Sequence, residues 1–294
     1  MNILPKNPRF NLDSDTILPP DTRAQIDECL ARLKYHRKIY SEWNFKSIDP
    51  SGISAILNFY GPPGTGKTLT AEALAGTLGL QIIFLGIAEL ESKFMGETAK
   101  NIQMAFSEAA KSGAILFFDE ADTLLGKRLS SVTQGVDNEV NAMRSTLLIE
   151  LERYEGIVIF ATNFAKNYDE AFRSRIAYHI KFNLPDFDSR KRLWSRMFIS
   201  EIPIGDDRDL LIERCTELSD GFSGREIRTC MRLALPKALI EFETTGGIPQ
   251  VTIEHIRSAI SQIRTAQAEV ASHAKHADIS SKEASLAKNM LGVH

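Results

Sequence analysis

The sequence has little of what marks a secreted protein. It holds only three cysteines, Cys29, Cys215 and Cys230, which is an odd number. Their separations match neither the close spacings of zinc sites nor those of disulfide frameworks. This usage predicts reduced thiols in a cytosolic protein.

Long apolar runs are also missing. The longest, around Ile115 to Phe118 and Ile157 to Ala161, are far too short to span a bilayer. The first residues, Met1 to Lys6, lack the apolar region of a signal peptide. We therefore expect a cytoplasmic protein with no membrane partner.

Charge of either sign is not in strong excess. A net charge of −3 makes nucleic acid unlikely as a partner bound by bulk electrostatic attraction, although a local basic groove would escape this count. Apolar residues, in contrast, are plentiful. They make up 43% of the 294 residues, which is enough for the cores of one large and one smaller domain.

The motif G-x-x-x-x-G-K-T at Gly61 to Thr68 is the most informative stretch of the chain. It follows the apolar run Ile53 to Tyr60, typical of a buried strand, and precedes Leu69 to Leu78, which has helical spacing. A strand, a glycine-rich loop and a helix in this order predict a loop that binds phosphate through backbone N–H groups and the helix dipole. We expect Lys67 to reach the β- and γ-phosphates and the Thr68 hydroxyl to bind Mg²⁺. The predicted nucleotide-binding residues of this stretch are Pro63, Gly64, Thr65, Gly66, Lys67, Thr68 and Leu69.

Polar residues follow two further apolar runs. Ala114 to Phe118 ends in Asp119 and Glu120, and a buried parallel strand that ends in paired acids is what a Walker B motif requires. We expect Asp119 to bind nucleotide-associated Mg²⁺ and Glu120 to polarise the attacking water. Asn163 follows the strand Gly156 to Ala161, and its amide could orient water against the γ-phosphate. The alternative for Asn163 is an ordinary turn residue at a strand end.

Further strands and helices alternate around these motifs. Strands are predicted at Gln81 to Leu85 and Ala177 to Phe182, and helices at Ala99 to Lys111, Asp137 to Arg153 and Asp169 to Arg175. This alternation predicts an α/β fold with a five-stranded parallel sheet between helices. An extended arm over Met1 to Pro20 and a helix over Ala24 to Trp43 come first.

Beyond Pro185 the pattern becomes wholly helical. Helices are predicted over Ser189 to Ser200, Asp209 to Leu218, Ser223 to Glu243 and Thr252 to about His273. Ser223 and Glu226 form a capping-box pattern, and Pro236 should kink or split its helix. The expected organisation is an arm at 1–20, a nucleotide-binding domain at 21–184, a small helical lid at 185–276 and a flexible tail at 277–294.

A phosphate loop, an Asp-Glu pair, an asparagine and a helical lid in this order make the chain resemble an AAA+ ATPase from about Ile17 to Ala271. The resemblance implies that the nucleotide is ATP with Mg²⁺. The stretch Lys93, Phe94, Met95 and Gly96 is similar to the pore loop of substrate-threading members, where an aromatic-aliphatic pair grips an unfolded chain. Burial of Phe94 in the core is the alternative.

Three arginines receive roles from the same resemblance. Asp169 to Ala177 is similar to the stretch that carries arginine fingers, which act in trans on the next subunit's nucleotide. Arg175 fits the Ser-Arg form best; Arg173 is the second candidate, with a solvated helix face as its alternative. Such a finger contributes about 10³ to 10⁵ in rate. Arg225, in the Ser-Gly-Arg of the lid, stands where many relatives have alanine and is a further candidate for catalysis.

The Ser-Gly-Arg sequence, the proline-interrupted helix after it and Val140-Asn141-Ala142 are similar to the pachytene-checkpoint remodelling ATPases. That resemblance implies a homohexamer that partly unfolds a HORMA-domain protein, with bacterial relatives that serve anti-phage signalling. The expected function is ATP-driven remodelling of a protein partner. The alternatives are a DNA-associated loader, which predicts a basic inner rim and stimulation by DNA, and a generic unfoldase with another substrate. A scaffold that binds ATP without turnover is disfavoured by intact Asp119, Glu120 and Asn163.

Overall fold

The computed structural model of the protein describes residues 3–49, 54–86, 97–126, 136–163 and 168–290. The chain divides into two compact units, Met1–Pro185 and Asp186–His294. None of the helices in the described ranges combines the length and the apolar character needed to cross a membrane.

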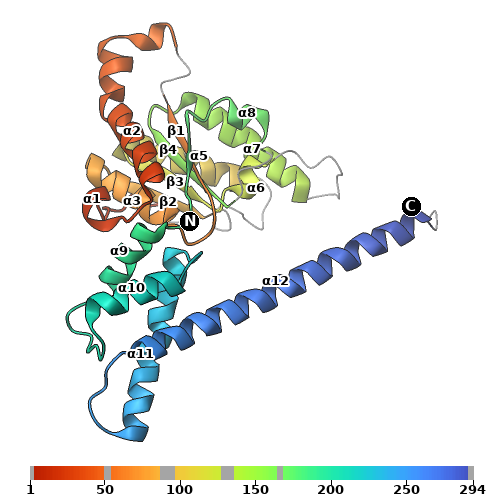
Figure 1. Ribbon diagram of the computed structural model, residues 1–294. Helices are drawn as coiled ribbons and strands as arrows, with labels where there is room; N and C mark the ends of the chain where they lie inside the picture. Colours follow the sequence, from red (N-terminus) through yellow and green to blue (C-terminus); the bar gives the residue numbers. More distant parts are fainter. Residues whose placement is uncertain (1–2, 50–53, 87–96, 127–135, 164–167, 291–294) are drawn as a thin grey trace. The chain divides into compact units, whose positions relative to one another are not determined.

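A five-stranded parallel sheet forms the centre of the first unit (Figure 1). Its strands are β1 (Ala55–Tyr60), β2 (Ile82–Gly86), β3 (Ile115–Asp119), β4 (Ile157–Thr162) and β5 (Tyr178–Lys181), in the order β2-β3-β4-β1-β5. Nearly every residue of β1, β3 and β4 is buried, which explains why these strands read as continuous apolar runs. The predicted α/β fold with five parallel strands is confirmed.

Helices cover both faces of this sheet (Figure 1). One core cluster joins the sheet to α2 (Pro20–Arg37) and α3 (Lys67–Leu78), and the other joins it to α5 (Glu97–Ser112) and α7 (Val136–Arg153). The helix predicted to run to Trp43 continues beyond α2 as a π-helix, η1 (Lys38–Glu42). In the described part of the unit, the remaining short helices are α1 (Leu12–Asp15), η2 (Phe45–Ser47), α6 (Asp122–Leu125) and α8 (Glu170–Arg173).

The N-terminal arm is not a free extended segment, because its apolar residues pack into the first unit. Leu12 lies in α1 and Leu18 follows it, and both are buried in the core cluster that contains α3. Lys6 pairs with Ile82 at the edge of the sheet through backbone hydrogen bonds of 2.8 and 3.0 Å. The scattered apolar residues thus anchor the arm, and backbone pairing covers part of the exposed strand edge.

The arm also binds the helix that follows the phosphate loop. The Arg9 guanidinium donates from Nε to Glu72 Oε1 at 3.0 Å and from Nη2 to Glu72 Oε2 at 3.2 Å. Glu72 lies in α3 and is buried. Gly76, one turn later, permits a close approach, because a Cβ there would lie 2.1 Å from the backbone oxygen of Phe10. The arm therefore crosses α3 in direct contact with its backbone.

The second unit is helical, as the sequence predicts. It consists of α9 (Phe187–Met197), α10 (Arg208–Leu218), α11 (Gly224–Thr245) and α12 (Ile253–Met290), around a core that includes Trp194 and Phe198. The predicted capping box is confirmed at the start of α11: Ser223 N donates to Glu226 Oε2 at 2.6 Å, and Glu226 N donates to Ser223 Oγ at 3.4 Å.

Two helices of this unit continue where the sequence predicted a break or an end. α11 is not split at Pro236, although proline removes a backbone donor. Buried Ala234 and Ala238 on either side pack into the core and hold the helix together. α12 reaches Met290, so most of the tail expected at 277–294 is helical. Residues 274–290 contain no glycine or proline. Their intrinsic helix propensity therefore allows α12 to continue, although they have few large apolar residues to bury.

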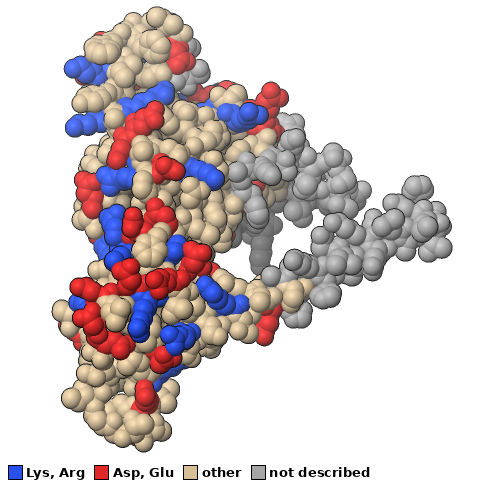
Figure 2. All heavy atoms as spheres, in the orientation of Figure 1, with Lys and Arg blue, Asp and Glu red and all other residues tan. Residues whose placement is uncertain are grey.

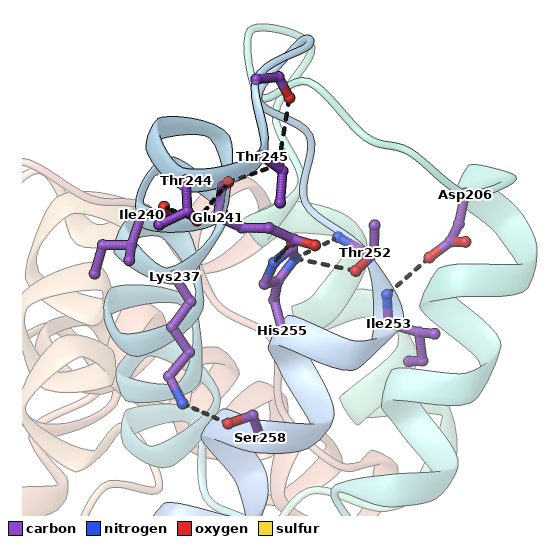
Figure 3. A network of polar contacts seen from close by, with 11 residues as sticks. Asp206, Lys237, Ile240, Glu241, Thr244, Thr245, Thr252, Ile253, His255 and Ser258 are labelled. Carbon is purple, nitrogen blue, oxygen red and sulfur yellow. Dashed lines mark hydrogen bonds and ion pairs between the residues drawn. The ribbon is translucent and has the colours of Figure 1, made fainter.

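A polar network joins the end of α11 to the start of α12 (Figure 3). The backbone N of Thr252 donates to His255 Nδ1 at 3.1 Å, so the ring carries its proton on Nε2 and donates it to Glu241 Oε2 at 2.6 Å. Asp206 accepts a hydrogen bond of 2.7 Å from the backbone N of Ile253. These contacts close the loop between the two helices.

The three cysteines are free and buried. Burial raises the pKa of Cys29, Cys215 and Cys230 to about 12. These thiols stay protonated and unreactive at neutral pH, which agrees with the expected reduced state.

Candidate nucleotide-binding site

The loop after β1 has the backbone of a phosphate cradle. Gly61 has a φ of +146°, and a side chain there would place its Cβ 2.0 Å from the backbone oxygen of Phe182, so only glycine fits. α3 begins at Lys67 directly after the loop and turns the positive end of its dipole toward it. The other residues predicted to bind nucleotide, Pro63, Gly64, Thr65, Gly66, Thr68 and Leu69, lie in this loop and in the first turn of α3.

The Lys67 side chain is buried and folds back over the loop. Its Nζ donates to the backbone oxygens of Gly61 at 2.8 Å and Pro62 at 3.0 Å, and to Asn163 Oδ1 at 3.1 Å. The ammonium group is thus held at the loop by oxygen acceptors. The oxygens of a bound phosphate carry negative charge. They would therefore accept stronger hydrogen bonds from the Lys67 ammonium than these neutral oxygens do.

Thr68 and Asp119 bring two hard oxygen ligands together. Thr68 Oγ1 donates to Asp119 Oδ2 at 3.0 Å, which joins the start of α3 to the end of β3. Among the described residues, no group of three or more His, Cys, Asp and Glu side chains gathers into a metal site. One carboxylate and one hydroxyl fit Mg²⁺, which usually takes its other ligands from phosphates and water.

Glu120 has an unusual backbone. Its φ is +54°, in the left-handed region that non-glycine residues rarely occupy and that costs about 1–2 kcal/mol. Its backbone N donates to Asp119 Oδ1 at 3.0 Å, and the next residue, Ala121, donates from N to the backbone oxygen of Ala161 at 2.9 Å. These bonds hold a sharp turn at the end of β3, which carries the exposed Glu120 side chain beside Asp119.

Asn163 follows β4, which lies between β3 and β1 in the sheet. Its side-chain oxygen is engaged by Lys67, so its NH₂ group is the part that can donate to a phosphate or to water. Its backbone N donates to both carboxylate oxygens of Asp122, each at 3.2 Å. Asp122 thereby positions Asn163 and belongs to the site, a role that the sequence analysis does not predict. The signal in the sequence that could have indicated this role is the position of Asp122, an acidic residue three places after Asp119.

The predicted arginines do not join this group of side chains within the first unit. Arg175 donates from Nη1 to the backbone oxygen of Ala171 at 2.7 Å, and its Nη2 forms an ion pair with Glu152 of α7. Arg173 is the exposed last residue of α8. Arg225 is exposed in the first turn of α11, in the second unit. The predicted pore-loop residues, Lys93, Phe94, Met95 and Gly96, lie outside the described residues.

These observations define the class of protein. A parallel sheet with a glycine-rich loop and lysine after β1, a carboxylate at the end of β3 and an amide after β4, which lies between those two strands, is a P-loop nucleoside-triphosphatase domain. Residues 57–184 match the profile of the family described as ATPase family associated with various cellular activities (AAA). The chain therefore contains an AAA ATPase domain.

Curated relatives agree with this assignment. The chain is 35% identical over 194 residues to the katanin p60 ATPase-containing subunit A1 of Strongylocentrotus purpuratus, covering 61% of this chain and 36% of that protein. It is 35% identical over 210 residues to a cell division cycle protein 48 homologue of Archaeoglobus fulgidus, covering 67% and 28%. The chain spans 26% to 56% of the length of the curated relatives it matches.

A solved structure supports the fold. The FIGL-1 AAA domain in complex with ADP superposes with a TM-score of 0.65 at 21% identity, over 86% of this chain and 84% of that one. The chain is also 32% identical over 219 residues to fidgetin-like protein 1 of Drosophila melanogaster, covering 69% of this chain and 40% of that protein. The relatives of this AAA ATPase domain thus include a katanin subunit, a cell division cycle protein 48 homologue and fidgetin-like protein 1.

Proposed function

We propose that the protein hydrolyses Mg-ATP in sites shared between the subunits of a homohexamer and uses this energy to remodel a folded protein partner. The observation that carries the proposal is the convergence of Lys67, Thr68, Asp119 and Asn163 at the ends of three adjacent strands. A buried lysine beside a glycine loop and a hydroxyl-carboxylate pair are the parts that phosphoryl transfer requires.

Each side chain has a distinct task in this proposal. Lys67 binds the β- and γ-phosphates, and Thr68 and Asp119 hold Mg²⁺, which supplies charge neutralisation when it is bound. Glu120 orients the attacking water and accepts its proton. Asn163 donates from its NH₂ group toward that water or the γ-phosphate, while its oxygen stays with Lys67.

Arg175 is the proposed finger for the neighbouring subunit. Its present ion pair with Glu152 is partly solvated, since the two side chains are 31% and 57% exposed. Pairs of this kind contribute at most about 1 kcal/mol, so a negatively charged phosphate of the next subunit can compete for the guanidinium. Arg173 and Arg225 remain further candidates for contacts with the nucleotide.

A protein is the proposed substrate, and Phe94 and Met95 are proposed to grip it. The relatives named above are a katanin subunit, a cell division cycle protein 48 homologue and fidgetin-like protein 1. On the face shown in Figure 2, basic and acidic side chains of the described residues are interspersed, which gives little support to binding of nucleic acid. The resemblance to the pachytene-checkpoint ATPases makes a HORMA-domain protein of an anti-phage system the first partner to test.

The experiment that tests the shared site mixes two inactive variants. Arg175→Ala keeps its own pocket, whereas Lys67→Ala loses its pocket but still presents Arg175. Random equimolar mixing would place an intact pocket against an intact arginine at about one quarter of the interfaces. We expect ATP hydrolysis to reappear in the mixture. The shared site would be contradicted if adding Lys67→Ala restored no hydrolysis to Arg175→Ala. A hydrolysis rate per subunit that does not depend on protein concentration would also contradict it.

Arg173→Ala is the matched control for this experiment, because Arg173 lies on the same short segment. If the trans contact belongs to Arg175, Arg173→Ala should keep most of the activity alone. Restoration of Arg173→Ala instead of Arg175→Ala would move the finger to the other arginine.

A further inference from the structure

Three side chains form a closed polar triangle inside the first unit. Asn58 Nδ2 donates to the Tyr168 hydroxyl at 2.8 Å, Thr162 Oγ1 lies 2.9 Å from the same hydroxyl, and Thr162 Oγ1 donates to Asn58 Oδ1 at 3.5 Å. Asn58 is fully buried and Thr162 is 1% exposed. We call Asn58, Thr162 and Tyr168 the polar triangle.

The contacts of the polar triangle form one connected network. Thr162 Oγ1 donates to Asn58 Oδ1, and the Thr162 and Tyr168 hydroxyls share a hydrogen bond in which either can be the donor. Hydrogen bonds in such a network strengthen one another.

The strand register explains why these residues meet. Asn58 is paired with Phe160 of β4, and Thr162 lies two residues beyond Phe160, so the side chains of Asn58 and Thr162 point to the same face of the sheet. His179 of β5 is paired with Asn58 on the other side. The Tyr168 ring stacks on the His179 ring with centroids 6.1 Å apart and an interplanar angle of 18°. Contacts with three neighbouring strands thus fix Tyr168.

Each corner of the polar triangle is next to a part of the proposed machinery. Thr162 directly precedes Asn163, and Asn58 is three residues before Gly61, where the phosphate loop begins. Tyr168 directly precedes Asp169, whose carboxylate caps α8 by accepting from the backbone N of Ala171 at 3.0 Å.

Tyr168 is also tied to the arginine segment through the backbone. Asp169 N donates to the backbone oxygen of Leu125 at 2.8 Å, and Tyr168 forms a bridge with Gly126. Ala171, the residue that Asp169 caps, is the one whose backbone oxygen accepts from Arg175. A continuous chain of contacts therefore leads from the polar triangle to the guanidinium of Arg175.

We propose that Tyr168 is a positioning residue for Arg175, held by the polar triangle so that one subunit presents its arginine correctly to the nucleotide of the next. This inference rests on the shared site of the proposed function. The Tyr168 hydroxyl acts through the arginine segment and touches neither nucleotide nor Mg²⁺. Its effect on hydrolysis is therefore exerted in trans.

The test is Tyr168→Phe, which removes one oxygen and keeps the aromatic ring. We expect ATP hydrolysis by the variant to fall about 10-fold to 100-fold, the range that follows from a misplacement of about 1 Å at a reacting centre. Its affinity for Mg-ATP should stay within about 3-fold of the wild type, because its own pocket is intact. Equimolar Lys67→Ala should restore hydrolysis, as it should for Arg175→Ala. Tyr178→Phe is the matched control and should be active. It removes a tyrosine hydroxyl from β5 that accepts a hydrogen bond from Arg32 of α2.

A second variant separates positioning from stability. Tyr168→Phe leaves Asn58 and Thr162 short of a partner, and this also lowers stability. The triple variant Asn58→Leu, Thr162→Val, Tyr168→Phe replaces the whole polar triangle by apolar groups of similar shape, which should return the melting temperature toward the wild-type value. We expect hydrolysis to stay low in the triple variant, and Lys67→Ala to restore it.

Four results would overturn the proposal. Wild-type hydrolysis by Tyr168→Phe would show that the hydroxyl positions nothing. Hydrolysis that recovers together with the melting temperature in the triple variant would reduce the polar triangle to a structural feature. If Lys67→Ala restores hydrolysis to Arg175→Ala but not to Tyr168→Phe, the variant impairs its own subunit's site. The path would then run from Thr162 to the adjacent Asn163. If neither variant is restored, the shared site itself fails and the proposal fails with it.

Discussion

Gly76→Ala tests how the arm is held on α3, and the structure reverses the sign that helix propensity predicts. In an open helical position alanine is more favourable than glycine by about 1 kcal/mol, because glycine loses more backbone entropy. Gly76 lies inside α3, so propensity alone predicts a more stable protein. The new Cβ, however, would lie 2.1 Å from the backbone oxygen of Phe10 and 3.2 Å from Asn11 Oδ1. The arm must move away.

The size of the effect follows from what the arm buries. Leu12 is 0% and Leu18 is 6% exposed. Burial of one leucine side chain contributes about 1.5–3 kcal/mol. After subtraction of the propensity gain, the free energy of unfolding should fall by about 0.5 kcal/mol if Leu12 alone leaves the core and contributes the low end of that range, and by up to about 5 kcal/mol if both leucines leave it.

The assay is urea unfolding of Gly76→Ala, followed by circular dichroism, together with a double-mutant cycle. In the wild type, Leu12→Ala should cost about 2–5 kcal/mol. In the Gly76→Ala background it should cost much less, because Leu12 has already left the core. An increase in stability on Gly76→Ala, with the full cost of Leu12→Ala retained, would refute the reasoning.

Three further predictions concern the site, the predicted pore loop and acid stability. Glu120→Gln should bind Mg-ATP about as tightly as the wild type but lower turnover about 10²–10³-fold, and near-normal phosphate release would assign Glu120 another role. Phe94→Ala should lower stability by less than about 1 kcal/mol and abolish partner-stimulated turnover if Phe94 is displayed, whereas a thermal-melting loss of about 3–5 kcal/mol would return it to the core. Hydrogen bonds from Arg9 hold the pKa of Glu72 below its ordinary 4.5, so its stabilisation is present above about pH 4.5 and is lost as pH falls through the lowered pKa. Glu72→Gln should flatten this acid dependence, and unfolding curves with unchanged pH dependence would contradict it.

The parts of the site that the sequence predicts are those encoded by local pattern. The loop at Gly61, the acids after β3 and Asn163 each follow an apolar run, and parallel strands bring their ends to one edge of the sheet. The structure joins Lys67 to Asn163 and Thr68 to Asp119, as that pattern implies.

The parts that the sequence does not predict depend on strand order and register. Asn58 reads as one polar residue in an apolar strand, and its partners become visible only once β1 lies beside β4. Tyr168 and Asp122 act through contacts whose partners are distant in the sequence or belong to another strand end. The docked arm was missed for a related reason, because its anchoring residues are too widely spaced to show a period.

Strand order also has a consequence for biosynthesis. β1 pairs only with β4 and β5 among the described strands, and Ala55 is in register with Ile157. A nascent chain released before Ile157 carries the whole phosphate-loop motif but has no strand against which β1 can form. The phosphate-loop motif is synthesised early, but the sheet that holds it in place can form only after β4 has been synthesised. A ribosome that stalls between the two therefore yields a polypeptide that contains the motif and cannot retain nucleotide.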